Sequence, residues 1–166
     1  MSKRDGTVLL NWIKSLREAA WAPLLVFGIH LLAFLVFDTY KYFPDFDVPM
    51  HSLGGVVMAF FLNRAFISAS KLGIIGGYHP ITHRLLVFTS TCTVAISWEF
   101  AEYGTDWWLG TQIQGTLEDN LGDLFWGAIG GLFYIVTSAV LKRSRVLPFA
   151  RKGQHIKHTD AVTISE

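Results

Sequence analysis

The chain has a single cysteine and little charge, and both shortages exclude classes of protein. Cys92 lies in an apolar run, which excludes a disulfide framework and zinc sites built from paired thiols. Charged residues make up 16% of the 166 residues, and the net charge of +1 provides no basic footprint for nucleic acid. The sequence also lacks a Gly-x-Ser-x-Gly motif, a phosphate-binding loop and the Lys/Arg triad of lipid phosphatases. Serine-nucleophile chemistry therefore has no support.

Apolar residues, by contrast, make up 51% of the chain. They gather in four stretches, at about 20–38, 50–68, 84–103 and 121–141. Each stretch approaches the roughly 20 residues that a helix needs to cross about 30 Å of hydrocarbon. We therefore predict an all-α fold, an integral membrane bundle of four transmembrane helices over residues 20–141.

The two flanking segments differ from this bundle. In residues 1–19, apolar side chains share one helical face, and the expected structure is an interfacial amphipathic helix. That face consists of Val8, Leu9, Trp12, Ile13 and Leu16. Residues 142–166 are basic and then polar, which predicts a cytoplasmic tail without a fold of its own.

The cations are distributed unevenly along these segments. With four spans, 13 of the 14 lysines and arginines fall on the side of the two termini and the 69–83 loop, and Lys41 alone falls opposite. Because cytoplasmic loops retain Lys and Arg, we predict a protein of the inner (plasma) membrane with both termini in the cytoplasm.

Three acidic motifs lie at the predicted outer ends of the spans. They are Asp47-Val-Pro-Met-His51 at the start of the second span, Glu99-Phe-Ala-Glu102-Tyr-Gly-Thr-Asp106 at the end of the third, and Asp119-Asn-Leu-Gly-Asp123 at the start of the fourth. Antiparallel alternation brings these ends together. Two carboxylates about 5 Å apart repel by about 3 kcal/mol at an effective dielectric constant of about 20. Protons or a bound cation must therefore offset the repulsion.

A divalent cation is the sharper hypothesis, because an oxygen-rich site with one imidazole suits Mg²⁺, Mn²⁺, Ca²⁺, Zn²⁺ or non-haem iron. Glu99-x-x-Glu102 has a carboxylate where di-iron bundles have a histidine, so ferritin-like oxidation is not expected. Glu99 or Glu102 is the candidate general base. The predicted ligands are His51, Glu99, Glu102, Asp106, Asp119 and Asp123, with Asp47 either a ligand or a partner of one.

Plainer explanations stay open for several of these residues. Asp47 stands before Pro49 and Asp119 follows Thr116 by three positions, so both acids also suit helix starts. Asp106 also fits a solvated loop, and His51 and His30 also fit structural hydrogen bonds. Small residues in the second and fourth stretches favour close helix packing. They are Gly54, Gly55, Gly127, Gly130 and Gly131.

The order of the acidic motifs resembles a known family pattern. Asp47-x-x-x-His51, Glu99-x-x-Glu102 and Asp123 followed by Gly127 to Gly131 look like the VanZ-like and YjdF-like small polytopic membrane proteins, over about residues 45–131. The chain has Trp126-Gly127 where that pattern has an asparagine. The resemblance implies a multi-pass inner-membrane protein and, in the VanZ branch, a link to the cell envelope and to glycopeptide-antibiotic tolerance.

Three functions follow as hypotheses. In the first, the cation site acts on, or recognises, a phosphate-bearing lipid or envelope head group, with or without turnover. In the second, the acids belong to a proton- or cation-coupled transport element, which predicts a polar path to the inner face. In the third, the acids only hold the helices of a scaffold subunit together.

Overall fold

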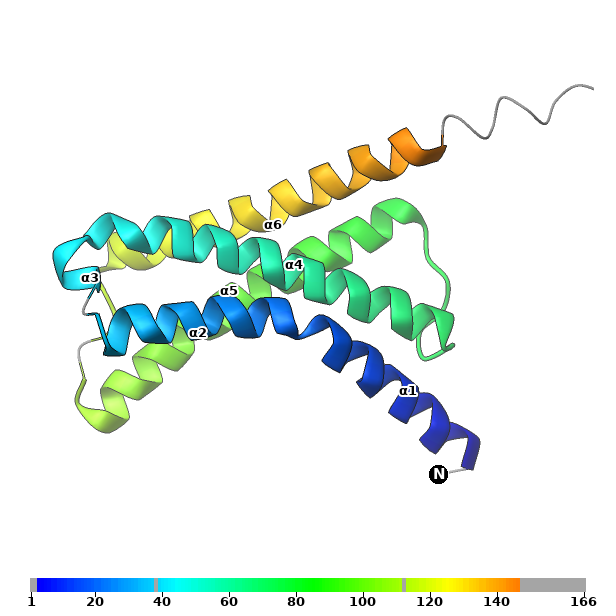
Figure 1. Cartoon of the computed structure of the whole chain (residues 1–166), viewed down its shortest axis with the longest axis horizontal. Helices are drawn as coiled ribbons and strands as arrows, with labels where there is room; N and C mark the ends of the chain where they lie inside the picture. Colours follow the sequence, from blue (N-terminus) through cyan, green and yellow to red (C-terminus); the bar gives the residue numbers. More distant parts are fainter. Residues whose placement is uncertain (1–2, 38, 112, 147–166) are drawn as a thin grey trace, which may run out of the picture. The chain divides into compact units, whose positions relative to one another are not determined.

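The computed structural model describes residues 3–37, 39–111 and 113–146, and it confirms the predicted all-α fold (Figure 1). The described residues form helices and connections without a strand. Contacts within the chain define one compact unit that ends at Val136 and a second that begins at Thr137, so that α6 contributes to both. In order, the elements are α1 (Lys3–Ala19), α2 (Trp21–Leu35), α3 (Thr39–Tyr42), the 3₁₀-helix η1 (Pro44–Phe46), α4 (Asp47–Lys71), α5 (Pro80–Leu109) and α6 (Leu117–Val146).

The first apolar stretch forms a shorter helix than predicted. Of the described residues 20–37, Trp21–Leu35 form the helix, and these 15 residues extend about 22 Å, less than the hydrocarbon thickness. Pro23 explains the break before it, since a proline ring collides with the carbonyl group four residues earlier, and α1 ends at that residue, Ala19. The two helices bend by 46° at the break, and only together do they qualify as one broken span or a re-entrant loop.

Two helices are long and apolar enough to cross a membrane on their own. They are α4 and the Leu117–Leu141 part of α6, each of 25 residues. The third predicted span lies in α5, whose serines, threonines and two glutamates dilute its apolar character. The described residues therefore contain two candidate spans, or three if the bent pair counts as one, where the sequence predicts four.

Helices α4 and α6 pack backbone against backbone through the predicted glycines. A β-carbon on Gly55 would collide with the carbonyl oxygen of Gly127, and one on Gly130 would collide with that of Ser52. Gly54 differs, because a β-carbon there would meet no atom within 4 Å. This contact fixes the first residues of α4 beside those of α6, since the two helices run in the same direction away from it.

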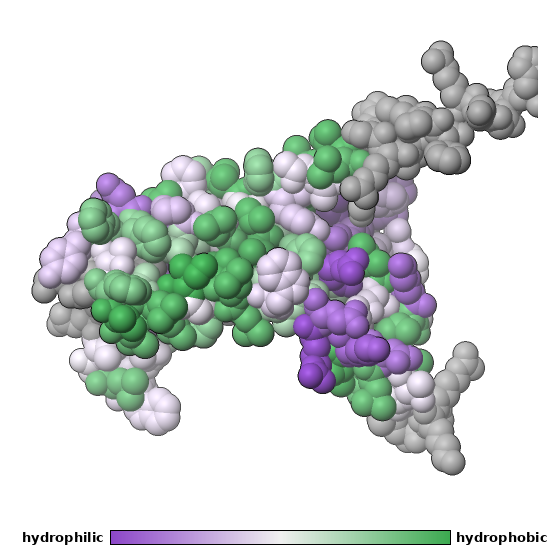
Figure 2. All heavy atoms as spheres, in the orientation of Figure 1, coloured by the Kyte–Doolittle hydropathy of each residue, from purple (hydrophilic) through white to green (hydrophobic). Residues whose placement is uncertain are grey.

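Residues 3–19 are helical, but α1 is also attached to the bundle. The indole Nε1 of Trp12 donates a hydrogen bond of 3.2 Å to the carbonyl oxygen of Ala65 in α4. Figure 2 shows hydrophilic side chains gathered around α1 and apolar ones over α2.

Towards the C-terminus, α6 continues to Val146, into the segment 142–166 that is expected to be an unstructured tail. Residues 147–166 lie outside the described residues.

Candidate metal centre

The start of α4 places the first two functional side chains one helical turn apart. Asp47 and Pro49 occupy the first turn, where proline is tolerated because those backbone N–H groups have no partner within the helix. Asp47 and His51 then lie on the same face, and Asp47 Oδ1 is 3.2 Å from His51 Nε2. The imidazole is thereby held by a carboxylate of its own helix.

The start of α6 adds a second carboxylate to the same ring nitrogen. Asp123 Oδ1 lies 3.5 Å from His51 Nε2, and its side chain is only 13% exposed. One ligand atom from each of Asp47, His51 and Asp123 lies within 4.8 Å of the other two. In an octahedral site with bonds of about 2.1 Å, neighbouring ligands lie roughly 3 Å apart, so two oxygens and one nitrogen at these distances can share one cation.

Glu99 of α5 is a third carboxylate that acts on this cluster electrostatically, although it lies outside the group of three described side chains whose ligand atoms are close enough to hold a metal ion. Its side chain is 8% exposed, and its Oε2 is buried without a hydrogen-bond partner among the residues that the structure describes. Glu99 interacts electrostatically with His51 and Asp47, and it lies one turn beyond Ala95, which faces Gly127 across α5 and α6. A buried carboxylate oxygen without a donor is costly, so its position beside the cluster calls for a cation or a proton. We refer to Asp47, His51, Asp123 and Glu99 as the acid–histidine cluster.

The three remaining predicted ligands have other partners or lie exposed. Glu102 accepts a hydrogen bond of 2.8 Å from Trp98 Nε1. Asp119 is exposed, and its backbone N–H donates to the Thr116 hydroxyl at 3.2 Å, in agreement with the cap that the sequence indicates at the start of α6. Neither residue belongs to the group of described side chains whose atoms meet closely enough to hold a metal ion.

Asp106, also outside that group, organises the connection between α5 and α6. Its carboxylate accepts hydrogen bonds from the Thr111 hydroxyl at 2.6 Å and from the backbone N–H groups of Ile113 and Gln114, both at 2.8 Å. It lies beyond the apolar stretch that ends near residue 103. The bond from Thr111, together with those from the two backbone groups, lowers the pKa of the Asp106 carboxyl below its usual 3.8. This arrangement stabilises the loop and explains Asp106 without a metal.

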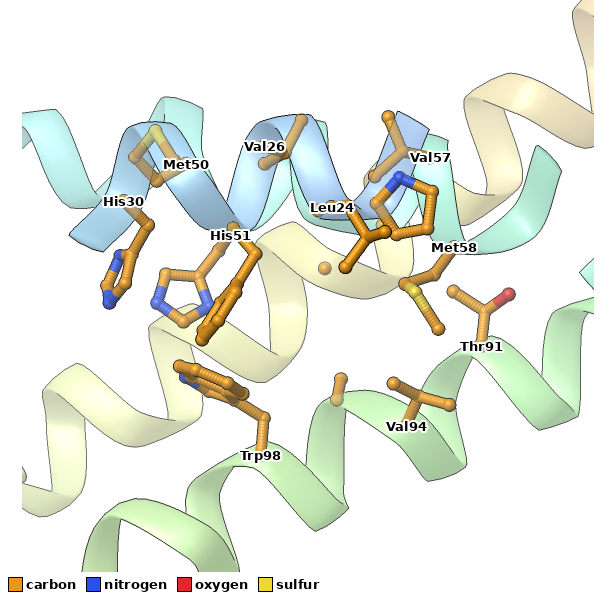
Figure 3. A pocket seen from close by; sticks show the side chains of 16 residues that line it. Leu24, Val26, His30, Met50, His51, Val57, Met58, Thr91, Val94 and Trp98 are labelled. Atoms are coloured by element: carbon orange, nitrogen blue, oxygen red, sulfur yellow. The ribbon is translucent and has the colours of Figure 1, made fainter. Parts of the chain in front are cut away.

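A cavity of about 310 Å³ lies next to the cluster, between α2, α4 and α5. His51 belongs to both, since its side chain also lines the cavity (Figure 3). His30 and Trp98 lie beside it, with their ring centroids 5.7 Å apart. The rest of the lining is almost entirely apolar. Gly54 belongs to this lining and takes no part in the backbone contact between α4 and α6.

Sequence reasoning missed a second polar group at the opposite end of α4. His83 Nε2 lies 2.7 Å from Asn63 Oδ1, and the Asn63 amide donates to the Tyr134 hydroxyl at 2.9 Å. Because Asn63 Oδ1 can only accept, His83 carries its proton on Nε2. The other ring nitrogen of His83 lies 3.3 Å from the Tyr78 hydroxyl. The only hint in the sequence was an asparagine inside an apolar stretch.

Comparison with protein families gives the setting of this cluster. Residues 4–144 match the family described as predicted membrane protein (DUF2238). The chain belongs to this family. Its surroundings are accordingly a lipid bilayer, which agrees with its long apolar helices. No curated protein and no solved structure matches the chain. The family description agrees with the small membrane protein predicted above, while the narrower resemblance to VanZ-like and YjdF-like proteins stays a prediction.

Proposed function

We propose that the acid–histidine cluster binds a divalent cation, through which this membrane protein recognises or acts on a lipid or envelope head group that bears phosphate. The observation that carries the proposal is the buried Glu99 Oε2, which has no hydrogen-bond partner among the described residues, in a side chain that interacts electrostatically with His51 and Asp47. A cation would supply positive charge at the end of the bundle where the predicted topology places a single lysine, Lys41.

The chemistry of the donor set favours a metal ion over a purely structural ion pair. His51 Nε2 has a carboxylate oxygen at 3.2 Å and another at 3.5 Å, and one imidazolium proton cannot serve both well. Carboxylates with one imidazole suit Mn²⁺, Zn²⁺ or Fe²⁺, while Mg²⁺ and Ca²⁺ would rely on the oxygens. In an enzyme, the ion would polarise a phosphoryl or carbonyl oxygen. Of the two candidate bases, Glu99 is favoured because Glu102 is bonded to Trp98.

The proposed topology keeps four spans in the inner membrane with both termini in the cytoplasm. The lysine and arginine bias supports this orientation, which places the cluster on the outer side. Helix α5 can be the third span despite its hydroxyl groups, since several of them donate to carbonyl groups of the preceding turn of α5. These bonds are Thr89 to Leu85, Thr91 to Val87, Thr93 to Thr89 and Ser97 to Thr93.

Metal analysis of the purified protein tests the proposal. Wild-type protein, purified in detergent and titrated with Mn²⁺ or Zn²⁺, should bind stoichiometrically by mass spectrometry of the elements, and Mn²⁺ should show coupling to a nitrogen nucleus in pulsed electron paramagnetic resonance. Asp123→Asn and Glu99→Gln should lose this binding. Glu118→Gln is the matched control, since it removes one exposed carboxylate from the same end of α6. If wild-type protein bound no more metal than Asp123→Asn and Glu99→Gln, protonation of the acids would be the better explanation of how their repulsion is offset.

The transport alternative has one observation in its favour, the polar group around Asn63 and His83 at the far end of α4. The cavity between the two ends is lined almost entirely by apolar side chains, which does not provide a path for ions. Proton flux in proteoliposomes that depends on both Asp123 and His83 would favour transport. A scaffold subunit would show neither flux nor metal binding.

A further inference from the structure

We infer that the cavity beside the cluster holds one hydrocarbon chain of a membrane lipid, whose anionic head group is placed at the cation. The inference rests on the proposed function for the head group, but its claim about the chain is independent of the metal. The ligand inferred here is therefore an amphiphile, with a hydrocarbon chain and an anionic head group, and not a free phosphate compound.

The two ends of the cavity differ in polarity in the way that such a ligand requires. At one end, His30, His51 and Trp98 bring polar ring atoms beside the acid–histidine cluster (Figure 3). Met58 of α4 and Thr91 of α5 lie at the other end of the cavity. Met58 follows His51 by seven residues, which corresponds to about 10 Å along the axis of α4. The Thr91 hydroxyl donates to the Val87 carbonyl oxygen of its own helix at 2.8 Å. The far end therefore offers no polar group in need of a partner.

The size and setting of the cavity select a hydrocarbon occupant. At about 310 Å³ it has roughly twice the volume of an engineered apolar cavity that accepts benzene. Water would need two to four polar partners, which the far end does not offer. An empty cavity would forfeit dispersion contacts along its lining. Within a bilayer, the surrounding medium that can supply such contacts is lipid chains.

Photolabelling of wild-type protein tests where the chain lies. Two phosphatidic acid probes would be used, one with a diazirine at the end of an acyl chain and one with the diazirine close to the head group. The first should label peptides that contain Met58 and Thr91, and the second peptides that contain Met50 and Trp98. Labelling by the chain-end probe that is confined to exposed positions such as Leu132 and Phe133 would overturn the inference.

A glycine pair provides matched variants. Gly54 lines the cavity, and a β-carbon there would meet no atom within 4 Å, so Gly54→Leu should fill the cavity and abolish labelling of Met58 and Thr91. Gly28 of α2 has equal free space and does not line the cavity, so Gly28→Leu should label like wild type. Equal labelling of Met58 and Thr91 in both variants would overturn the inference, because a filled cavity cannot admit the chain.

Removal of the metal separates this inference from the proposed function. EDTA should reduce labelling by the phosphatidic acid probes and leave labelling by a diacylglycerol with the same chain unchanged, because only the phosphate would contact the cation. If EDTA did not change labelling of the cavity by the phosphatidic acid probes, the proposed function would be contradicted and only the site for the hydrocarbon chain would be supported. Intact metal binding without labelling in the cavity would contradict the chain site alone.

Discussion

Asp123→Asn is expected to change stability in opposite directions with and without a divalent cation. Ligand atoms of Asp47, His51 and Asp123 lie within 4.8 Å of one another. At an effective dielectric constant of about 20, two carboxylates at that separation repel by about 3 kcal/mol. With no cation and a neutral imidazole, the asparagine variant avoids this repulsion and should be more stable than wild type by up to that amount.

Thermal unfolding in detergent measures the effect. The buffer should be alkaline enough to deprotonate a histidine that lies beside two carboxylates, so that no imidazolium offsets them. For a chain of this size, about 3 kcal/mol corresponds to a shift in Tm of roughly 6–12 °C. In EDTA the variant should therefore melt above wild type. Saturating Mn²⁺ should raise the Tm of wild type beyond that of the variant, because only wild type keeps both aspartates.

Glu118→Gln removes an exposed charge from the same end of α6 and should follow wild type under both conditions. The electrostatic reasoning would be refuted by an Asp123→Asn protein that melts below wild type in EDTA, together with a wild-type Tm that does not respond to Mn²⁺. That result would identify the three side chains as a structural ion pair.

Three further predictions concern residues outside the cluster. Gly55→Val should destabilise the protein by about 1–3 kcal/mol in thermal unfolding, whereas Gly54→Ala should have little effect, because only Gly55 lies against the backbone of α6. Asn63→Leu should cost about 1–3 kcal/mol in the same assay by leaving His83 without its 2.7 Å partner, and a cost near zero would contradict this bond. Asp106→Asn should increase amide exchange in the 110–116 loop at neutral pH. In wild type, the lowered pKa of Asp106 means that its carboxylate stabilises the loop fully above the usual carboxyl pKa and that this stabilisation is lost only as the pH falls through the lowered pKa. Equal amide exchange in wild type and Asp106→Asn at neutral pH would contradict this prediction.

Much of the helical framework could be predicted from the sequence, because apolar runs and helix ends are local properties. Pro49 and Thr116 mark the starts of α4 and α6, and the structure has both. The break after Ala19 agrees with the predicted division between residues 1–19 and the stretch 20–38, and Pro23 gives it a steric cause. The end of α2 at Leu35 was not predicted, because the apolar run continues to Phe37 without a local stop signal.

The candidate site was predictable in part for a related reason. Helical spacing predicts Glu99, Glu102 and Asp106 on one face of a helix, but spacing cannot say what each side chain on that face meets. Glu99 interacts electrostatically with residues of α4, Glu102 accepts a hydrogen bond from Trp98 of its own helix, and Asp106 accepts hydrogen bonds from a loop whose conformation no periodicity specifies. Gly54 and Gly55 are adjacent and chemically identical and both line the cavity, yet only Gly55 also lies against the backbone of α6, because neighbours on a helix point about 100° apart.

The glycine contact between α4 and α6 also determines which parts of the protein can move. Where two backbones touch, neither helix can slide or roll without steric collision, so α4 and α6 act as one rigid frame near Gly55 and Gly130. Helices α2 and α5 border the same cavity through side chains, which can change rotamer. Any widening that admits a guest must therefore come from displacement of α2 or α5, while Asp47, His51 and Asp123 keep their mutual spacing throughout.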